Sequence, residues 1–218
     1  MAALVKICGL TTPDMIDAAI TAGADMIGLV HFVRSPRHVD PAAAAALANR
    51  ARDRVAVVSL LVDPDDAMID DVLRHVSPDI LQLHGGESVE RVAAIRRRTD
   101  RRIMKAIKVE TAADAAEAKA YADAADIILF DAKAPKGALL PGGNGLAFDW
   151  RSLAEVTPKL GSWMLSAGLT PETVAEAIRL TGAPAVDVSS GVETAPGVKD
   201  ADLIRRFLLA ARPAKQQA

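Results

Sequence analysis

The chain has little that would suit a secreted, membrane-bound or nucleic-acid-binding protein. Its 218 residues include one cysteine, Cys8, which excludes an intramolecular disulfide. No apolar stretch reaches the ~20 residues of a membrane-spanning helix, and the first residues lack the apolar core of a signal peptide. The net charge is −2, so there is no electrostatic case for nucleic acid or an anionic membrane as partner. We expect a cytoplasmic protein.

What the chain does have is a regular alternation of short apolar runs with alanine-rich helical stretches. No linker interrupts this alternation, so residues 1–212 are predicted to form one domain, and residues 213–218 a flexible tail. The predicted strands cover residues 4–8, 26–32, 55–62, 80–83, 103–109, 127–130, 162–165 and 185–188. The predicted helices cover residues 13–22, 41–51, 64–75, 88–97, 112–122, 150–156, 171–180 and 200–211.

Eight such units favour a single-domain α/β fold, a (β/α)₈ TIM barrel, although periodicity alone leaves an open doubly wound sheet possible. Four helices are predicted to begin at a proline that follows a capping side chain: Thr12, Asp40, Asp63 and Thr170. In such a barrel the active site lies at the carboxyl ends of the strands. The residues there include Cys8, Arg37, His84 and Asp131.

Two glycine-containing loops follow the seventh and eighth predicted strands, at Gly168 and at residues 189–191. Small residues let backbone N–H groups crowd an anion, so these loops predict a phosphate site. A longer loop, residues 141–145 (PGGNG), is predicted to act as a lid. Two interpretations of Cys8 are open: it is either a small buried apolar residue or a thiol whose pKa is lowered for catalysis.

Several motifs together resemble phosphoribosylanthranilate isomerase over nearly the whole chain. They are residues 6–11 (KICGLT), 35–37 (SPR), 81–85 (LQLHG), 142–145 with FDW at 148–150, 186–193 (VDVSSGVE) and 196–200 (PGVKD). The resemblance implies a substrate, N-(5′-phosphoribosyl)anthranilate, and an Amadori rearrangement in tryptophan biosynthesis. It implies that Cys8 is the base and Asp131 the acid. The substrate-binding residues it implies are Arg37 (for the carboxylate), His84, Gly143, Gly145, Gly168, Ser189, Ser190 and Gly191.

This chemistry requires neither a metal nor a cofactor, and no Cys/His cluster suggests a metal site. It does require a raised pKa for Asp131 and a lowered one for Cys8. Lys6, on the same strand face as Cys8, is predicted either to favour the thiolate or to pair with Asp187. Departures from the family pattern at Asn144 and Ala167 bear on phosphate binding, and His31 replaces an apolar or aromatic residue.

Three other functions remain open on the sequence. The isomerase of histidine synthesis would use two aspartates, which Cys8 disfavours. A carbon–carbon bond-forming or lyase barrel would show a catalytic lysine and glutamate at strand ends, and the sequence does not offer a convincing pair. A catalytically silent phosphate binder has the same fold, since fold alone does not fix function. No strong apolar surface stripe is apparent, so a monomer is predicted over a homodimer.

Overall fold

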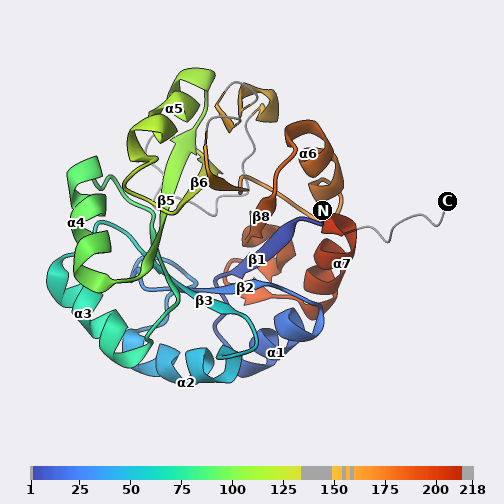
Figure 1. Cartoon of the computed structure of the whole chain (residues 1–218). Helices are drawn as coiled ribbons and strands as arrows, with labels where there is room; N and C mark the ends of the chain where they lie inside the picture. Colours follow the sequence, from blue (N-terminus) through green and yellow to red (C-terminus); the bar gives the residue numbers. More distant parts are fainter. Residues whose placement is uncertain (1, 134–148, 154–155, 158–159, 213–218) are drawn as a thin grey trace.

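The computed structural model describes residues 2–133, 149–153, 156–157 and 160–212. Eight parallel strands close into a barrel in the order β1-β2-β3-β4-β5-β6-β7-β8 (Figure 1). The TIM-barrel prediction is therefore confirmed, and the open-sheet alternative is wrong. The strands are β1 (Leu4–Cys8), β2 (Met26–Val30), β3 (Ala56–Leu61), β4 (Ile80–Leu83), β5 (Arg102–Val109), β6 (Ile127–Ala132), β7 (Ser162–Leu165) and β8 (Ala185–Val188).

Helices cover the outside of the barrel, as the sequence predicts, with some differences in their bounds. They are α1 (Pro13–Thr21), α2 (Pro41–Ala51), α3 (Asp66–His75), α4 (Val89–Thr99), α5 (Ala112–Ala116), α6 (Val174–Thr181) and α7 (Ala201–Ala211). The predicted helix 112–122 divides into α5 and a 3₁₀ turn, η1 (Glu117–Tyr121). Where a helix was predicted at 150–156, the described residues form only a 3₁₀ turn, η2 (Trp150–Leu153). The predicted tail lies outside the described residues.

The predicted helix starts are confirmed at Thr12 and Asp40, whose side chains accept hydrogen bonds from the first turn. Two others are wrong. Helix α3 begins at Asp66 and is capped by Asp65, because Asp63 adopts a positive φ of 46° and accepts instead from the N–H of Gly86. Helix α6 begins at Val174, since residues 170–173 form a hydrogen-bonded turn before it.

The core has two parts, one inside the barrel and one between the barrel and its helices. Successive side chains of a strand point to opposite faces, so each strand contributes to both parts. The inner cluster is made of Met26, Val58, Ile80, Met104, Ala106, Ile127, Leu129, Met164 and Ala185. Polar side chains follow this cluster along the same strand faces, which places them at the carboxyl ends of the strands.

Three aspartates that precede even-numbered strands fasten those strands to their neighbours. The carboxylate of Asp25 accepts from the N–H of Val5 at 2.7 Å, and that of Asp79 from the N–H of Val57 at 2.7 Å. Asp126 does the same for the N–H of Ile103 at 2.8 Å. These contacts hold the amino-terminal end of the barrel and leave the carboxyl-terminal end to the functional residues.

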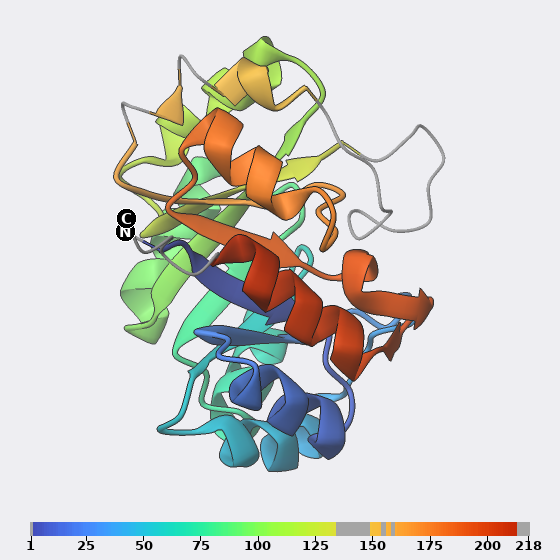
Figure 2. The same cartoon turned by 90° about the vertical axis from the view of Figure 1, so that its right-hand side faces the viewer.

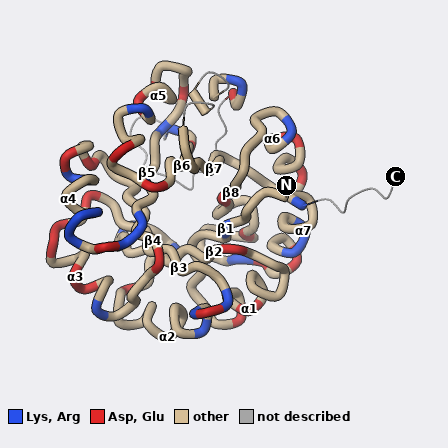
Figure 3. Tube along the Cα trace, in the orientation of Figure 1, with Lys and Arg blue, Asp and Glu red and all other residues tan. Residues whose placement is uncertain are grey.

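Charges of both signs are distributed over the outer helices (Figure 3). No described helix combines the length and apolarity needed to cross a membrane. A short hairpin of β9 (Glu193–Ala195) and β10 (Val198–Lys199) follows β8 and projects beyond the carboxyl ends of the strands (Figure 2). The hairpin brings Glu193 and Lys199 to the same end of the barrel as Cys8.

Candidate active site

The predicted site residues within the described part of the chain all lie at the carboxyl ends of the strands. Cys8 is the last residue of β1, and Asp131 the penultimate residue of β6. His84 directly follows β4, and Arg37 lies in the loop after β2. Gly168 follows β7, and Ser189, Ser190 and Gly191 follow β8. Gly143 and Gly145 lie outside the described residues.

The thiol of Cys8 is buried, and glycine at position 28 on β2 makes room for it. A Cβ at Gly28 would stand 2.8 Å from Sγ of Cys8 and 3.2 Å from Cε of Lys6. Burial raises the pKa of the Cys8 thiol, although the Lys6 ammonium opposes this. The lowered pKa expected from the sequence is therefore wrong for this structure, because removal from water disfavours the thiolate more than Lys6 favours it.

Lys6 pairs with Asp187, one of the two roles predicted for it. Its Nζ lies 3.0 Å from Oδ1 of Asp187, and the two residues are register partners on β1 and β8. Burial opposes the charge of Lys6, but Asp187 and Cys8 outweigh it and raise the pKa of the ammonium. Lys6 thus stays protonated beside the thiol, so the structural ion pair and the support of a thiolate coexist.

Asp131 lies across the barrel, between two donors that both reach its Oδ2. Nε2 of His84 and Nζ of Lys108 are each 3.1 Å from that oxygen. Burial alone would raise the pKa of Asp131, but Lys108 and His84 outweigh it and hold the pKa well below its usual range. The raised pKa expected from the sequence is therefore wrong here, because the sequence could not show the ammonium beside the carboxylate.

Gln82 sets the orientation and the tautomer of His84. Its side-chain Nε2 lies 2.9 Å from Nδ1 of His84. An amide nitrogen donates, so Nδ1 accepts and the proton of the neutral ring resides on Nε2, which donates to Asp131. Burial lowers the pKa of His84 and keeps the ring neutral. The role of His84 visible here is to hold the carboxylate of Asp131.

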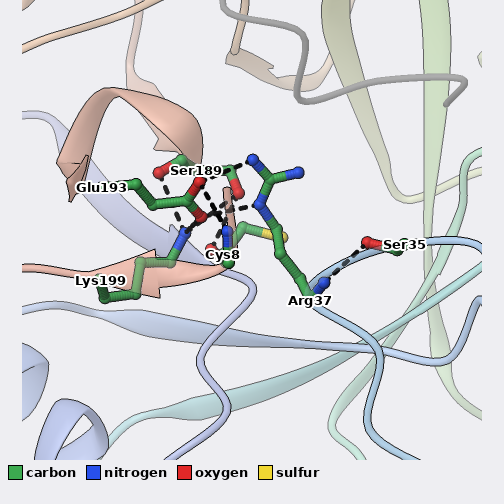
Figure 4. Close-up of polar contacts among 7 residues, drawn as sticks. Cys8, Ser35, Arg37, Ser189, Glu193 and Lys199 are labelled. Carbon is green, nitrogen blue, oxygen red and sulfur yellow. Dashed lines mark hydrogen bonds and ion pairs between the residues drawn. The ribbon is translucent and has the colours of Figure 1, made fainter. Parts of the chain in front are cut away.

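Arg37 is held by Glu193 rather than being left in solvent at the rim. Its Nε donates to Oε1 of Glu193 at 2.7 Å and its Nη2 to Oε2 at 2.8 Å (Figure 4). Lys199 donates to the same carboxylate at 2.6 Å and to the carbonyl oxygen of Ser189 at 3.0 Å. The hydroxyl of Ser189 donates to the carbonyl oxygen of Cys8 at 3.1 Å. These contacts join the β2 and β8 loops to the thiol strand.

The loops after β7 and β8 approach each other closely, as a phosphate site formed by both requires. A Cβ at Gly191 would stand 1.9 Å from the carbonyl oxygen of Leu169, so only glycine fits there. Ala167 and Gly168 are successive positive-φ residues, with φ of 88° and 65°. Such turns expose consecutive backbone N–H groups, which is the geometry of an anion site.

Sequence reasoning missed residues that support the predicted ones. Gly28 gives space to Cys8, Gln82 orients His84, and Lys108 pairs with Asp131. A glycine inside a strand was a usable signal for Gly28, since it often marks a close approach. Lys108 and Asp131 are register partners on β5 and β6, and that pairing is visible only once the barrel is assembled.

One lysine–glutamate pair of the described chain lies near the strand ends but does not contact Cys8 or Asp131. Lys105 and Glu87 pair at 2.7 Å, and Lys105 also donates to the carbonyl oxygen of Gly85 at 2.8 Å. Lys105 is adjacent along β5 to Met104 and Ala106 of the inner cluster, so it faces the helices. Among the described side chains, no group of three or more His, Cys, Asp or Glu is placed to hold a metal ion.

Comparisons with known proteins agree with this arrangement. The sequence profile of N-(5′-phosphoribosyl)anthranilate (PRA) isomerase matches residues 5–210. A Rhodopseudomonas palustris N-(5′-phosphoribosyl)anthranilate isomerase is 56% identical over 216 residues, 99% of each chain. The Thermotoga maritima phosphoribosyl anthranilate isomerase structure has a TM-score of 0.87 at 34% identity, covering 96% of this chain and 98% of that one. A similar structure (TM-score 0.84, 32% identity, 96% and 98% coverage) is a complex with reduced 1-(o-carboxyphenylamino)-1-deoxyribulose 5-phosphate. The chain belongs to the N-(5′-phosphoribosyl)anthranilate isomerase family.

Proposed function

We propose that this protein converts N-(5′-phosphoribosyl)anthranilate to 1-(2-carboxyphenylamino)-1-deoxyribulose 5-phosphate, a step of tryptophan biosynthesis, in the cytoplasm. The observation that carries the proposal is the placement of a thiol on β1 and a carboxylate on β6 at the same end of one closed barrel. Each has a lysine ammonium beside it, Lys6 for Cys8 and Lys108 for Asp131. An aldose–ketose rearrangement needs such an acid and base on opposite sides of the sugar.

The reaction consists of proton transfers and one ring opening. Asp131 gives a proton to the furanose ring oxygen as the C1′–O bond breaks, and the nitrogen lone pair forms the C1′=N bond of a Schiff base. Cys8 loses its thiol proton to solvent beside the Lys6 ammonium, which favours the thiolate. The thiolate then takes the C2′ proton, and the electrons of that C–H bond form the enolamine. Protonation at C1′ and loss of the C2′ hydroxyl proton give the ketone. Asp131 and Cys8 supply the first two transfers and solvent supplies the proton that C1′ gains, so the proposed reaction needs no cofactor.

The remaining predicted residues bind the two charged ends of the substrate. Arg37, oriented by Glu193, binds the anthranilate carboxylate, since a guanidinium suits that group. The phosphate binds to backbone N–H groups of the loops after β7 and β8, at Gly168, Ser189, Ser190 and Gly191. Gly143 and Gly145, which lie outside the described residues, are proposed to bind the substrate as well. His84, also predicted to bind substrate, lies beside the site and holds the carboxylate of Asp131.

Turnover of phosphoribosylanthranilate generated in situ, followed by the loss of its fluorescence, tests this function. We expect wild-type protein to turn over, and Cys8→Ala and Asp131→Asn each to lose at least ~10²-fold in kcat. Asp202→Asn, an exposed carboxylate on α7, is the matched control and should retain full activity. Full activity of Cys8→Ala would place the base elsewhere, and inactive wild-type protein would favour the silent phosphate binder.

We also propose that the protein is a monomer. The exposed large apolar residues of the described chain lie on separate segments: Leu4, Val33, Leu180, Val198 and Leu209. Single exposed apolar residues are normal on the surface of a monomer, whereas an interface is marked by a larger contiguous apolar patch. A related T. maritima isomerase is described as dimeric, and this chain would differ from it. Light scattering that gives twice the mass of one chain would contradict the proposal.

A further inference from the structure

Lys108 connects the buried carboxylate of Asp131 to solvent. Its side chain is 23% exposed, whereas the side chains of Asp131 and His84 are each 8% exposed. Lys108 therefore provides the more accessible of the two donor groups on Asp131. The Lys108 ammonium, 3.1 Å from Oδ2 of Asp131, is thus in contact with both the carboxylate and water.

His84 does not supply that proton. Because Gln82 donates to Nδ1 of the ring, the neutral imidazole has a single N–H, on Nε2, which holds Asp131. Release of this proton would leave an imidazolate, which is far too basic to form beside a carboxylate. A doubly protonated ring is disfavoured by burial, which lowers the pKa of His84.

The two donors share one oxygen of the carboxylate. His84 and Lys108 both bind Oδ2 of Asp131, and within the described residues no hydrogen bond is made to Oδ1. Oδ1 is thus the oxygen left without a hydrogen bond from the described side chains. The ionised Asp131 of this structure has no proton to give, so the acid role requires that one be loaded.

We propose that Lys108 carries the proton that makes Asp131 an acid. This inference rests on the proposed function. An N–H bond of the Lys108 ammonium breaks and an O–H bond forms on Asp131, which leaves a neutral amine beside a carboxylic acid. The acid, after rotation of the carboxyl group, gives this proton to the ring oxygen of the substrate. Water then returns a proton to the amine of Lys108, which completes the cycle.

The surroundings of the pair allow this exchange. Burial lowers the pKa of the Lys108 ammonium, although Asp131 opposes this. The groups that face Asp131 are Lys108 from β5 and His84 from the end of β4. The charge of Lys105 also lowers the pKa of Lys108 and that of Glu87 raises it, and these two residues pair with each other. A bound substrate removes water from the pair, and this loss of solvation favours the neutral amine and carboxylic acid over the two ions.

Replacing Lys108 with arginine separates proton carriage from simple electrostatic support. Arginine keeps the charge and can donate to Asp131, but it does not release a proton near neutral pH. We expect Lys108→Arg and Lys108→Met to lower kcat alike, by at least about ten-fold, with little change in KM. Lys133→Met is the control, because Lys133 is exposed and pairs with Asp114, and it should have wild-type kinetics.

Chemical rescue supplies the second measurement. We expect added propylamine to restore part of the kcat of Lys108→Ala, with no such effect on wild-type protein or on Asp131→Asn. Wild-type kcat in Lys108→Arg, or no rescue of a folded Lys108→Ala, would overturn the inference. The proposed function fails separately, if Asp131→Asn retains full activity. Thermal unfolding of each variant confirms that it is folded.

Discussion

Glu193 holds both Nε and Nη2 of Arg37 and at the same time accepts from Lys199, so one carboxylate fixes two cations at the end of the barrel. The side chains of Glu193 and Arg37 are 4% and 6% exposed. Burial opposes ionisation of Glu193, but Arg37 and Lys199 lower its pKa. The position of Arg37 is thus set by a hairpin 156 residues away along the chain.

Glu193→Gln should raise KM about ten-fold and leave kcat nearly unchanged. A buried charge-assisted hydrogen bond contributes about 1.5–3 kcal/mol, and its loss frees Arg37 from the orientation that binds the substrate carboxylate. Steady-state kinetics with the fluorescent substrate measures both constants. Glu172→Gln is the control: Glu172 forms an exposed pair with Arg206 and its loss should leave KM alone. An unchanged KM in Glu193→Gln would remove the link between the hairpin and substrate binding.

Gly28→Ala should lower kcat by at least about ten-fold, because the added Cβ would stand 2.8 Å from Sγ of Cys8 and displace the thiol. Overpacking of this kind also costs about 1–3 kcal/mol of unfolding free energy, which denaturant unfolding measures. Gly161→Ala is the matched control, since a Cβ there meets nothing within 4 Å. A Gly28→Ala enzyme with wild-type kcat would show that the exact position of the thiol is unimportant.

Ala167→Gly should raise the free energy of unfolding by up to about 1 kcal/mol, since φ of Ala167 is 88°, where a Cβ is strained. Ala183→Gly serves for comparison: Ala183 is buried and lacks a positive φ, so the same substitution there should destabilise. Denaturant unfolding at neutral pH measures both. If Ala167→Gly destabilises as much as Ala183→Gly, the backbone strain at Ala167 contributes nothing.

Stability should fall between pH 7 and pH 5 because of His31. Burial lowers the pKa of His31 to about 4, against 6.5 for the unfolded chain. As pH falls through 6.5 the unfolded chain takes up a proton that the folded protein excludes, so stability present above 6.5 is lost towards pH 4. The loss by pH 5 is about 2 kcal/mol.

His31→Gln should remove this component of the pH dependence, because glutamine does not titrate and can still reach Ser59 and the carbonyl oxygen of Val39. Denaturant unfolding of wild type and variant at pH 7 and pH 5 measures the difference. His75→Gln, at a partly exposed position on α3, is the control and should behave as wild type. Parallel losses in wild type and His31→Gln would exclude His31 as the cause.

The strand ends were predictable because apolar runs and their flanking glycines mark buried parallel strands. Because a (β/α)₈ barrel places the carboxyl ends of all its strands at one end, the strand predictions were enough to bring Cys8, His84 and Asp131 together. The expectation that a helix begins at a proline after a capping side chain was wrong at Asp63 and Thr170. The side chain of Asp63 accepts from the N–H of Gly86, and Thr170 belongs to a hydrogen-bonded turn that precedes the helix. A cap motif specifies a helix start only when nothing else competes for its side chain.

The protonation of the site could not be predicted from the sequence. Whether a thiol or carboxylate is ionised depends on which groups the barrel places beside it, and Lys108 is 23 residues from Asp131 along the chain. The pairing of Glu193 with Arg37 likewise joins residues that are 156 positions apart in the sequence. The sequence predicts candidate site residues, while the register of the closed sheet determines which residues lie beside them.

The most direct test of the account is the reaction in D₂O, with the product analysed by NMR and mass spectrometry. In the proposed mechanism Cys8 removes the C2′ proton and solvent supplies the one that C1′ gains, so the wild-type protein should form the ketose phosphate with one deuterium at C1′. Cys8→Ala and Asp131→Asn should form it only at the uncatalysed rate. Wild-type protein that does no better than buffer, or variants that match wild type, would contradict the account.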